Sequence, residues 1–157
     1  MKKNVTLFGL LFISISISLP VAAAKDPNKA AIEARQGEMQ LRAFNAGPLF
    51  AMAKGKMPYD AKMASELAGN LKTLLSLDNG RAWMQGTSNK DYPDDTTALP
   101  KIWKTWPDIA DYGKKYDKAV NELAAVAGDG QDALKSKIKA LGKGCKACHD
   151  DFRKKDD

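Results

Sequence analysis

Apolar side chains recur every three or four residues along four stretches of this chain, and that spacing constrains its fold. In the last stretch the repeat runs unbroken from Leu134 to Phe152. A spacing of three and four gives a helix one apolar stripe, whereas a strand requires alternation at every second residue. Valine, a strand former, occurs after Ala24 only at positions 120 and 126. The sequence therefore predicts an all-α fold.

Four helices are expected from these stripes and from the residues that punctuate them. The first helix begins near Pro27 and ends at 54–56, the second begins at Asp60, the third follows Pro100, and the fourth carries the last stripe. The expected inner face of the first helix reads Ile32, Arg35, Met39, Ala43, Ala46, Phe50 and Ala53. That of the third reads Ile102, Trp106, Ile109, Gly113, Tyr116, Val120, Leu123 and Ala127.

The connections complete the fold prediction. Residues 78–100 are rich in Gly, Asn, Asp, Thr and Pro, and a loop of about 20 residues is long enough to cross the end of a bundle. Pro48 is expected to kink the first helix after Asn45, because proline lacks an N–H donor and its ring clashes with the preceding turn. We therefore predict an antiparallel four-helix bundle with one long crossover loop.

Residues 1–24 have the three-part pattern of a secretory signal peptide. Lys2 and Lys3 give a positive start, an apolar stretch follows, and small residues close the segment. The apolar stretch is about 15 residues long, shorter than the roughly 20 that span a bilayer. We expect cleavage after Ala24, a mature domain of residues 25–157 in the periplasm, and no membrane insertion of that domain.

The charge of the mature chain excludes one class of partner. Removal of Lys2 and Lys3 leaves 23 basic and 19 acidic residues, so the formal net charge falls from +6 to +4. Charges of both signs are interspersed, and no long basic block occurs. We therefore expect no nucleic-acid binding.

The fourth helix carries the chemistry, in Cys145-Lys146-Ala147-Cys148-His149. This C-x-x-C-H segment contains both cysteines and the single histidine of the chain, and it is typical of covalent haem attachment. A thioredoxin-like site would follow a strand, a structural zinc site would need a fourth ligand, and a disulfide would leave the histidine unexplained. The sequence predicts one haem c, with thioether bonds to Cys145 and Cys148 and with His149 as an axial iron ligand.

A sixth iron ligand has to come from upstream, because only eight residues follow His149. Because the chain has no second histidine, we expect the sixth position to hold a methionine, a lysine or a small ligand, or to be empty. The methionines of the mature chain are Met39, Met52, Met57, Met63 and Met84. Met39 lies on the expected inner face of the first helix. We expect it at the distal face of the haem, either as the sixth ligand or as ordinary core filling.

Two arginines are expected close to the haem, and two tryptophans are expected to serve in packing. Arg35 precedes Met39 by one turn on the same stripe, and a buried guanidinium needs an anion, which a haem propionate would supply. The alternative for Arg35 is a solvated residue at the edge of the stripe. Arg153 follows His149 by one turn and is expected on the proximal side, over the ring face, at a propionate, or as a solvated cation near the helix end. Trp103 and Trp106 are interpreted as packing residues.

The chain resembles the cytochrome c′ family, the class II c-type cytochromes, over the whole mature sequence. The resemblance is carried in chain order by Ala34-Arg35-Gln36 with Met39, by Lys54-Gly55-Lys56-Met57-Pro58-Tyr59-Asp60, by Pro100-Lys101-Ile102-Trp103, and by Gly144-Cys145-Lys146-Ala147-Cys148-His149-Asp150-Asp151-Phe152-Arg153. The last segment is highly specific at a C-terminus.

The resemblance implies a left-handed bundle, a homodimer formed through the first two helices, and one haem with His149 as the proximal ligand. It places Arg35 and Gln36 on the propionate side. In most of the family the sixth site is vacant and lined by an apolar side chain, which corresponds to Met39 here. In a low-spin branch, a methionine at this position is the ligand. Arg35-Gln36 is more similar to the five-coordinate branch.

Two functions are compatible with these features. The first is one-electron transfer in the periplasm, with redox proteins as partners. The alternative is binding of NO or CO at an open ferrous site, which would sequester the gas. No carboxylate pair, Ser-His-Asp set or phosphate-binding glycine loop indicates an enzyme.

Overall fold

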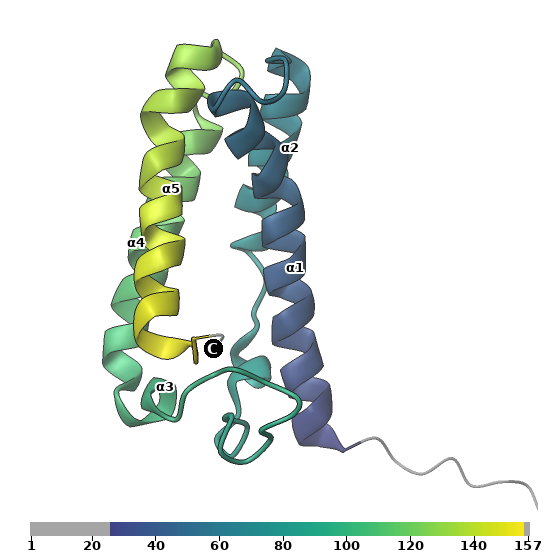
Figure 1. Ribbon diagram of the computed structural model, residues 1–157, viewed down its shortest axis with the longest axis vertical. Helices are drawn as coiled ribbons and strands as arrows, with labels where there is room; N and C mark the ends of the chain where they lie inside the picture. The colour runs from purple at the N-terminus through teal and green to yellow at the C-terminus, as the bar shows by residue number, and fades with distance from the viewer. Residues whose placement is uncertain (1–25, 156–157) are drawn as a thin grey trace, which may run out of the picture.

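The structure is a bundle of four long helices, as the sequence predicts. It is a computed structural model, and it describes residues 26–155, so that the predicted signal peptide lies outside the described residues. The elements run in the order α1 (Pro27–Ala53), α2 (Ala61–Leu74), the short 3₁₀ helix η1 (Gly80–Trp83), α3 (Lys101–Lys104), α4 (Trp106–Ala124) and α5 (Gln131–Phe152). Figure 1 shows α4 and α5 on one side of the bundle and α1 and α2 on the other.

The helix ends follow from identifiable residues. Asp26 caps α1 by accepting a 2.9 Å hydrogen bond from Asn28 N–H, and Asp60 caps α2 through Met63 N–H at 2.8 Å. Gly55, just after α1, has a φ of 70°, which a residue with a Cβ rarely adopts. α1 continues through Pro48 to Ala53, so the expected kink does not interrupt the helix.

The predicted third helix is in fact two helices. Lys101–Lys104 forms the single turn of α3, and α4 begins at Trp106 after a non-helical Thr105 with φ −123° and ψ 45°. Pro107 explains the break, because in a continuous helix it would have no N–H to donate to the Trp103 carbonyl and its ring would clash with that carbonyl. In the first turn of α4 the same proline is tolerated.

The hydrophobic core fills one half of the bundle. Leu49, Met52, Leu71, Leu123 and Leu134 are among the side chains buried completely there. The core therefore lies where the C-terminal half of α1 meets α2, the C-terminal half of α4 and the N-terminal half of α5.

Part of the expected inner face has a different role. On α1 the buried side chains are Ala31, Ile32, Arg35, Glu38, Asn45, Leu49 and Met52. Met39 and Ala43 instead line a cavity in the other half of the bundle, as do Trp106, Ile109 and Gly113 of α4. Ala46 and Phe50 pack against the core, as predicted, and also line that cavity. Trp106 is 47% exposed, so the prediction that it fits the core is wrong.

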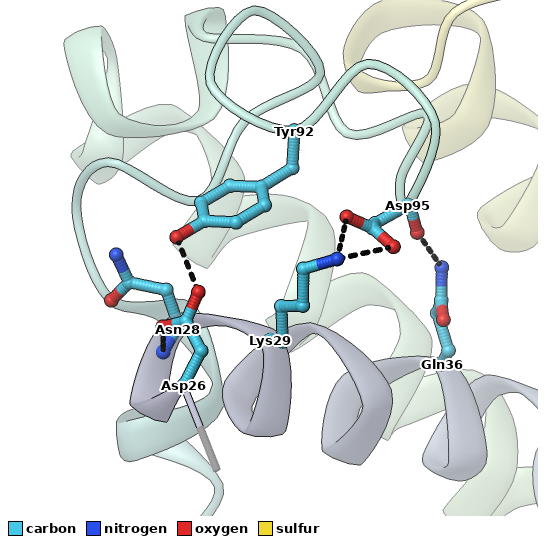
Figure 2. A network of polar contacts seen from close by, with 6 residues as sticks. All are labelled: Asp26, Asn28, Lys29, Gln36, Tyr92 and Asp95. Atoms are coloured by element: carbon cyan, nitrogen blue, oxygen red, sulfur yellow. Dashed lines mark hydrogen bonds and ion pairs between the residues drawn. The ribbon is translucent and has the colours of Figure 1, made fainter. Parts of the chain in front are cut away.

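The crossover loop is held against the start of α1 by polar contacts, which Figure 2 shows together. Tyr92 donates a 2.9 Å hydrogen bond to Asp26, and Lys29 forms a 3.0 Å ion pair with Asp95. Gln36 donates to the Asp95 carbonyl at 2.7 Å. The Asn28 N–H and the Tyr92 hydroxyl hold the pKa of Asp26 below its ordinary value, and these bonds favour the ionised cap.

The same loop is tied to the end of α5. Leu99 N–H donates to the Phe152 carbonyl at 2.9 Å, and Lys154 N–H donates to the Thr97 carbonyl at 2.8 Å. The loop thus joins the N-terminus of α1 to the C-terminus of α5. Within residues 26–155, no helix combines the length and apolarity needed to cross a membrane.

Candidate haem site

A cavity of about 520 Å³ opens between α1, α4 and α5 in the half of the bundle that the core leaves free. Its surface is overwhelmingly apolar, which is typical of cofactor sites. The α5 wall holds Leu141, Gly144, Cys145, Cys148 and His149, while the α1 wall holds Met39, Arg42, Ala43, Ala46, Gly47 and Phe50.

The C-x-x-C-H segment forms one wall of this cavity. Cys145 and Cys148 are unpaired, partly buried and one helical turn apart on α5. Burial raises the pKa of both thiols, and the charge of Arg42 opposes that shift. Burial, and then the charge of Arg153, lower the pKa of His149, which favours a neutral imidazole with a lone pair to offer a metal.

Met39 lies on the wall that faces this segment. It lines the cavity from α1 and is 36% exposed. The other methionines do not line the cavity: Met52 is buried in the core, Met57 packs against it, and Met63 and Met84 are exposed elsewhere. Of the five methionines considered as a sixth iron ligand, only Met39 therefore lies in the cavity wall.

A second cavity of about 460 Å³ adjoins the first, and Met39, Cys148 and His149 line both. Arg35, Gln36 and Arg153 line the second cavity, together with loop residues 96–98. The structure thus gathers every predicted site residue around two neighbouring cavities. The cysteines and His149 lie on α5, Arg35 and Met39 on α1, and Arg153 directly after α5.

The buried guanidinium of Arg35 is satisfied by neutral hydrogen-bond acceptors, so the expectation that it needs a propionate as a counterion is wrong. Its side chain is 3% exposed and donates hydrogen bonds to the Ala82 carbonyl at 3.2 Å, to Thr87 Oγ1 at 2.8 Å and to the Thr87 carbonyl at 2.5 Å. Thr96 Oγ1 accepts a further bond at 3.1 Å. These neutral acceptors belong to the crossover loop, so Arg35 fixes the loop against α1.

Two tryptophans complete the surroundings of Arg35. The guanidinium carbon lies 5.6 Å from the ring centre of Trp83 and 5.7 Å from that of Trp103. Trp103 Nε1 also donates to the Trp83 carbonyl at 2.8 Å. Because Trp83 lines both cavities, Arg35 and Trp103 position part of their common wall.

Sequence reasoning missed the polar side chains of the larger cavity. Arg42 lines it from α1, and Tyr112 and Tyr116 line it from α4. Arg42 follows Glu38 by four residues, a spacing that indicates an ion pair, but the stripe pattern excluded both from the expected inner face. Tyr116 was on the stripe and was treated as core.

These residues fit a haem. The cavity offers apolar walls, two unpaired thiols and one imidazole, which is the donor set that covalent haem attachment needs. Within residues 26–155, no group of three or more His, Cys, Asp and Glu side chains is arranged to hold a metal ion, so the zinc alternative lacks a ligand set there. Fold and site together define a four-helix-bundle cytochrome of the c type.

Comparison with known proteins agrees with that class. The family model for Cytochrome C′ matches residues 30–153. Cytochrome c′ of Cereibacter sphaeroides is 39% identical over 146 residues, which cover 93% of this chain and 97% of the relative. The chain belongs to the cytochrome c′ family, and it carries one haem c.

Solved structures of the family share the fold. The chain is similar to cytochrome c′ from Rhodobacter Spheriodes, with a TM-score of 0.80 and 40% identity over 82% of this chain and 98% of that one. It is also similar to a nitric oxide complex of a mutant of cytochrome c prime from Alcaligenes xylosoxidans, with a TM-score of 0.71 and 30% identity over 82% of this chain and 97% of that one.

We predict that Arg35→Met loosens the crossover loop. The change removes the buried donor and leaves the Ala82 and Thr87 carbonyls without it, so the free energy of unfolding should fall by about 3 kcal/mol. Urea titration measures the loss, and hydrogen exchange should show faster exchange in residues 82–97. Arg81 is exposed, so Arg81→Met is the control, and it should lower the free energy of unfolding by less than about 0.5 kcal/mol. Equal losses in the two variants would contradict this role for Arg35.

Proposed function

We propose that this chain is an exported cytochrome that carries one electron at a time on a haem bound to Cys145 and Cys148, with His149 as the proximal iron ligand. The supporting observation is that a single apolar cavity brings together both thiols and the one imidazole of the chain. The bound haem supplies an iron that alternates between the ferric and the ferrous state.

The residues of the cavity have distinct parts in this proposal. Cys145 and Cys148 would hold the haem along one turn of α5, and His149, the next residue on that helix, would supply the nitrogen ligand to its iron. The apolar side chains of α1 and α4 keep water away from the site and lower its local dielectric, which sets how strongly the two charge states of the iron differ in energy. Arg35, Gln36 and Arg153 line the second cavity, and we assign the haem carboxylates to that side.

Export is part of the same proposal. The leader, residues 1–24, is removed, and the mature protein of residues 25–157 acts in the periplasm with redox proteins as partners. Asp26 supports this division, because the residue that caps α1 lies directly after the expected cleavage region. The first helix thus begins directly after a capping residue of the proposed mature chain.

A reversible one-electron titration is the expected behaviour of the holoprotein. His149→Ala keeps both anchors but removes the proximal nitrogen, so it should shift the midpoint potential and change the ferrous optical spectrum. Spectroelectrochemistry measures both quantities. Lys146→Ala, exposed between the two anchors, is the control and should leave them unchanged. A midpoint that is the same in His149→Ala and in the unmodified protein would exclude His149 as the ligand.

A second candidate function, sequestration of NO or CO, is supported by the wall opposite His149. Met39 has a neutral and flexible side chain, and its neighbours on that wall include Ala43, Ala46 and Gly47, which are small. Small side chains leave room for a diatomic ligand at a vacant sixth site. The nitric oxide complex of the relative from Alcaligenes xylosoxidans is in keeping with this alternative.

The Met39→Ala variant tests the state of the sixth site. We expect a high-spin ferric spectrum both with and without Met39, and faster CO binding to the ferrous variant because a bulky side chain is gone. Met63→Ala is a matched control, since Met63 is also 36% exposed but lies outside the cavity. A change from low spin to high spin in Met39→Ala alone would show that Met39 is the sixth ligand.

Homodimer formation through α1 and α2 is also proposed. Phe44 is 75% exposed and Leu41 is 51% exposed, and the two lie one turn apart on α1. Large apolar side chains at this exposure are frequent at protein–protein contacts. Since neither residue lines either cavity, dimerisation through them would leave the haem site open.

We expect Phe44→Glu to convert the holoprotein to a monomer, because two carboxylates would be brought together across a symmetric contact. Sedimentation velocity measures the change in mass, and the optical spectrum should stay the same. Ala140→Glu, on an exposed position of α5, adds the same charge away from α1 and serves as the control. A Phe44→Glu protein that stays dimeric would place the contact elsewhere.

A further inference from the structure

The seam between α1 and α5 carries basic residues and no acidic ones, although charges of both signs are interspersed along the chain as a whole. Residues 39–59, on the α1 side, and residues 133–149 of α5 contain no Asp or Glu. The first range contains three Lys and Arg residues, and the second contains five. We call the surface formed by Lys54, Lys135, Lys139 and Lys143 the basic seam.

Two distances place the lysines of the two helices beside one another. α5 passes so close to α1 at Gly142 that a Cβ there would lie 3.3 Å from the ring of Phe50. The ammonium of Lys54, the residue after α1, lies 5.9 Å from the centre of the same ring. On α5, Lys143 follows Gly142 directly and Lys139 precedes it by one turn. Lys54 therefore adds its charge to the edge of α5.

The two lysines at the centre of the seam are not neutralised by the protein. Lys139 and Lys143 are exposed, and within residues 26–155 neither side chain has an ion pair or a hydrogen bond. The other lysines of α5 have carboxylate partners, at N–O distances of 3.5 Å (Lys135–Asp132), 3.1 Å (Lys137–Glu122) and 2.5 Å (Lys146–Asp150). The free charge of α5 is thus concentrated at Lys139 and Lys143.

This arrangement does not stabilise α5. Lys135, Lys139 and Lys143 follow one another at a spacing of four, and like charges at that spacing weaken a helix. On α4 the same spacing joins opposite charges, because Lys118 pairs with Glu122 at 2.8 Å. A local rule that is broken with no compensating contact inside the chain indicates a function outside it.

The basic seam lies over the wall of the cavity that carries the haem anchors. Cys145 and Cys148 line the larger cavity, while Lys139 and Lys143 face solvent on the same helix. An α-helix with its side chains is about 10 Å in diameter. A protein docked on the seam would therefore come within about one helix diameter of the two side chains that hold the haem, and electron exchange between proteins requires such a short distance.

The surroundings of the seam favour an acidic protein over a lipid membrane as its partner. A helix that binds a bilayer surface presents large apolar side chains beside its lysines. Among the described residues, none of the large exposed apolar side chains lies on α5. A carboxylate-rich protein surface needs only complementary charge, and such attraction raises the rate at which two proteins associate.

We propose that the basic seam is the docking surface for a redox protein that presents a carboxylate-rich face. This inference rests on the one-electron function proposed above and names the class of its partner. When the two proteins are docked, one electron passes between the partner's redox group and the haem iron. One group is oxidised and the other is reduced, and no proton or covalent bond is exchanged.

The test uses flavodoxin, an acidic one-electron donor protein, and lumiflavin semiquinone, a small uncharged donor with the same kind of ring. Time-resolved absorption measures the rate constant with which each donor reduces the ferric holoprotein. Lys139→Glu/Lys143→Glu reverses both free charges, so the rate constant with flavodoxin should fall about tenfold at low ionic strength. The rate constant with lumiflavin should stay the same, because an uncharged donor is not steered by the lysines.

Lys72→Glu/Lys90→Glu is the matched control. Lys72 of α2 and Lys90 of the crossover loop are also exposed, and within residues 26–155 their ammonium groups form no ion pair. The control changes the net charge equally but away from the seam, so the flavodoxin rate constant should fall less than about twofold. At about 200 mM salt the three proteins should react with flavodoxin at similar rates, because the Debye length is then shorter than about 10 Å.

Two results would overturn the proposal. The first is a flavodoxin rate constant that Lys139→Glu/Lys143→Glu leaves unchanged, and loss of binding to phosphatidylglycerol vesicles in the same variant would then assign the seam to a lipid surface. The second is an equal loss of rate in this variant and in the control, which would be an effect of net charge. Both results leave reduction by lumiflavin intact, whereas a holoprotein that neither donor reduces would contradict the electron-transfer function itself.

Discussion

The buried guanidinium of Arg35 is the interaction on which the open half of the bundle depends. α1 and α5 are far apart in sequence, and the crossover loop connects them at the end where the core stops. Arg35 binds that loop through the Ala82 and Thr87 carbonyls and through two threonine hydroxyls. With the loop fixed in this way, Trp83 becomes a stable wall of both cavities.

The two halves of the bundle have different roles: one holds the hydrophobic core and the other holds the cavities. Leu49, Leu123 and Leu134 fill the core half so completely that their side chains are fully buried, and this half supplies the hydrophobic stabilisation. In the other half the apolar stripes of α1, α4 and α5 face a cavity. One apolar stripe can line both halves of a helix. Apolar side chains pack equally well against neighbouring side chains in the core and against a flat apolar cofactor in the cavity.

Most of the fold could be predicted from the sequence because periodicity and chain breaks are local signals. The caps at Asp26 and Asp60, the end of α1 at Gly55 and the long crossover loop all follow from residues next to them in the chain. The break between α3 and α4 was missed because the apolar stripe continues across it and suggested one helix. Pro107, which cannot donate a backbone hydrogen bond, was the residue that could have indicated it. The contact between Arg42 and Tyr116 was missed because the two residues lie 74 positions apart in the sequence.

The sequence by itself determined the chemistry of this protein. Cys145, Cys148 and His149 lie within five consecutive residues, so their spacing on one helix needs no knowledge of the rest of the chain. Only the tertiary structure decided which side chains face them. Of the five methionines, only Met39 lines the cavity. Arg35 donates hydrogen bonds to the crossover loop, and Arg42 lies against the ring of Tyr116. The reason is physical: a stripe specifies that a residue faces inward, but the packing of the helices decides whether it meets core, loop or cavity.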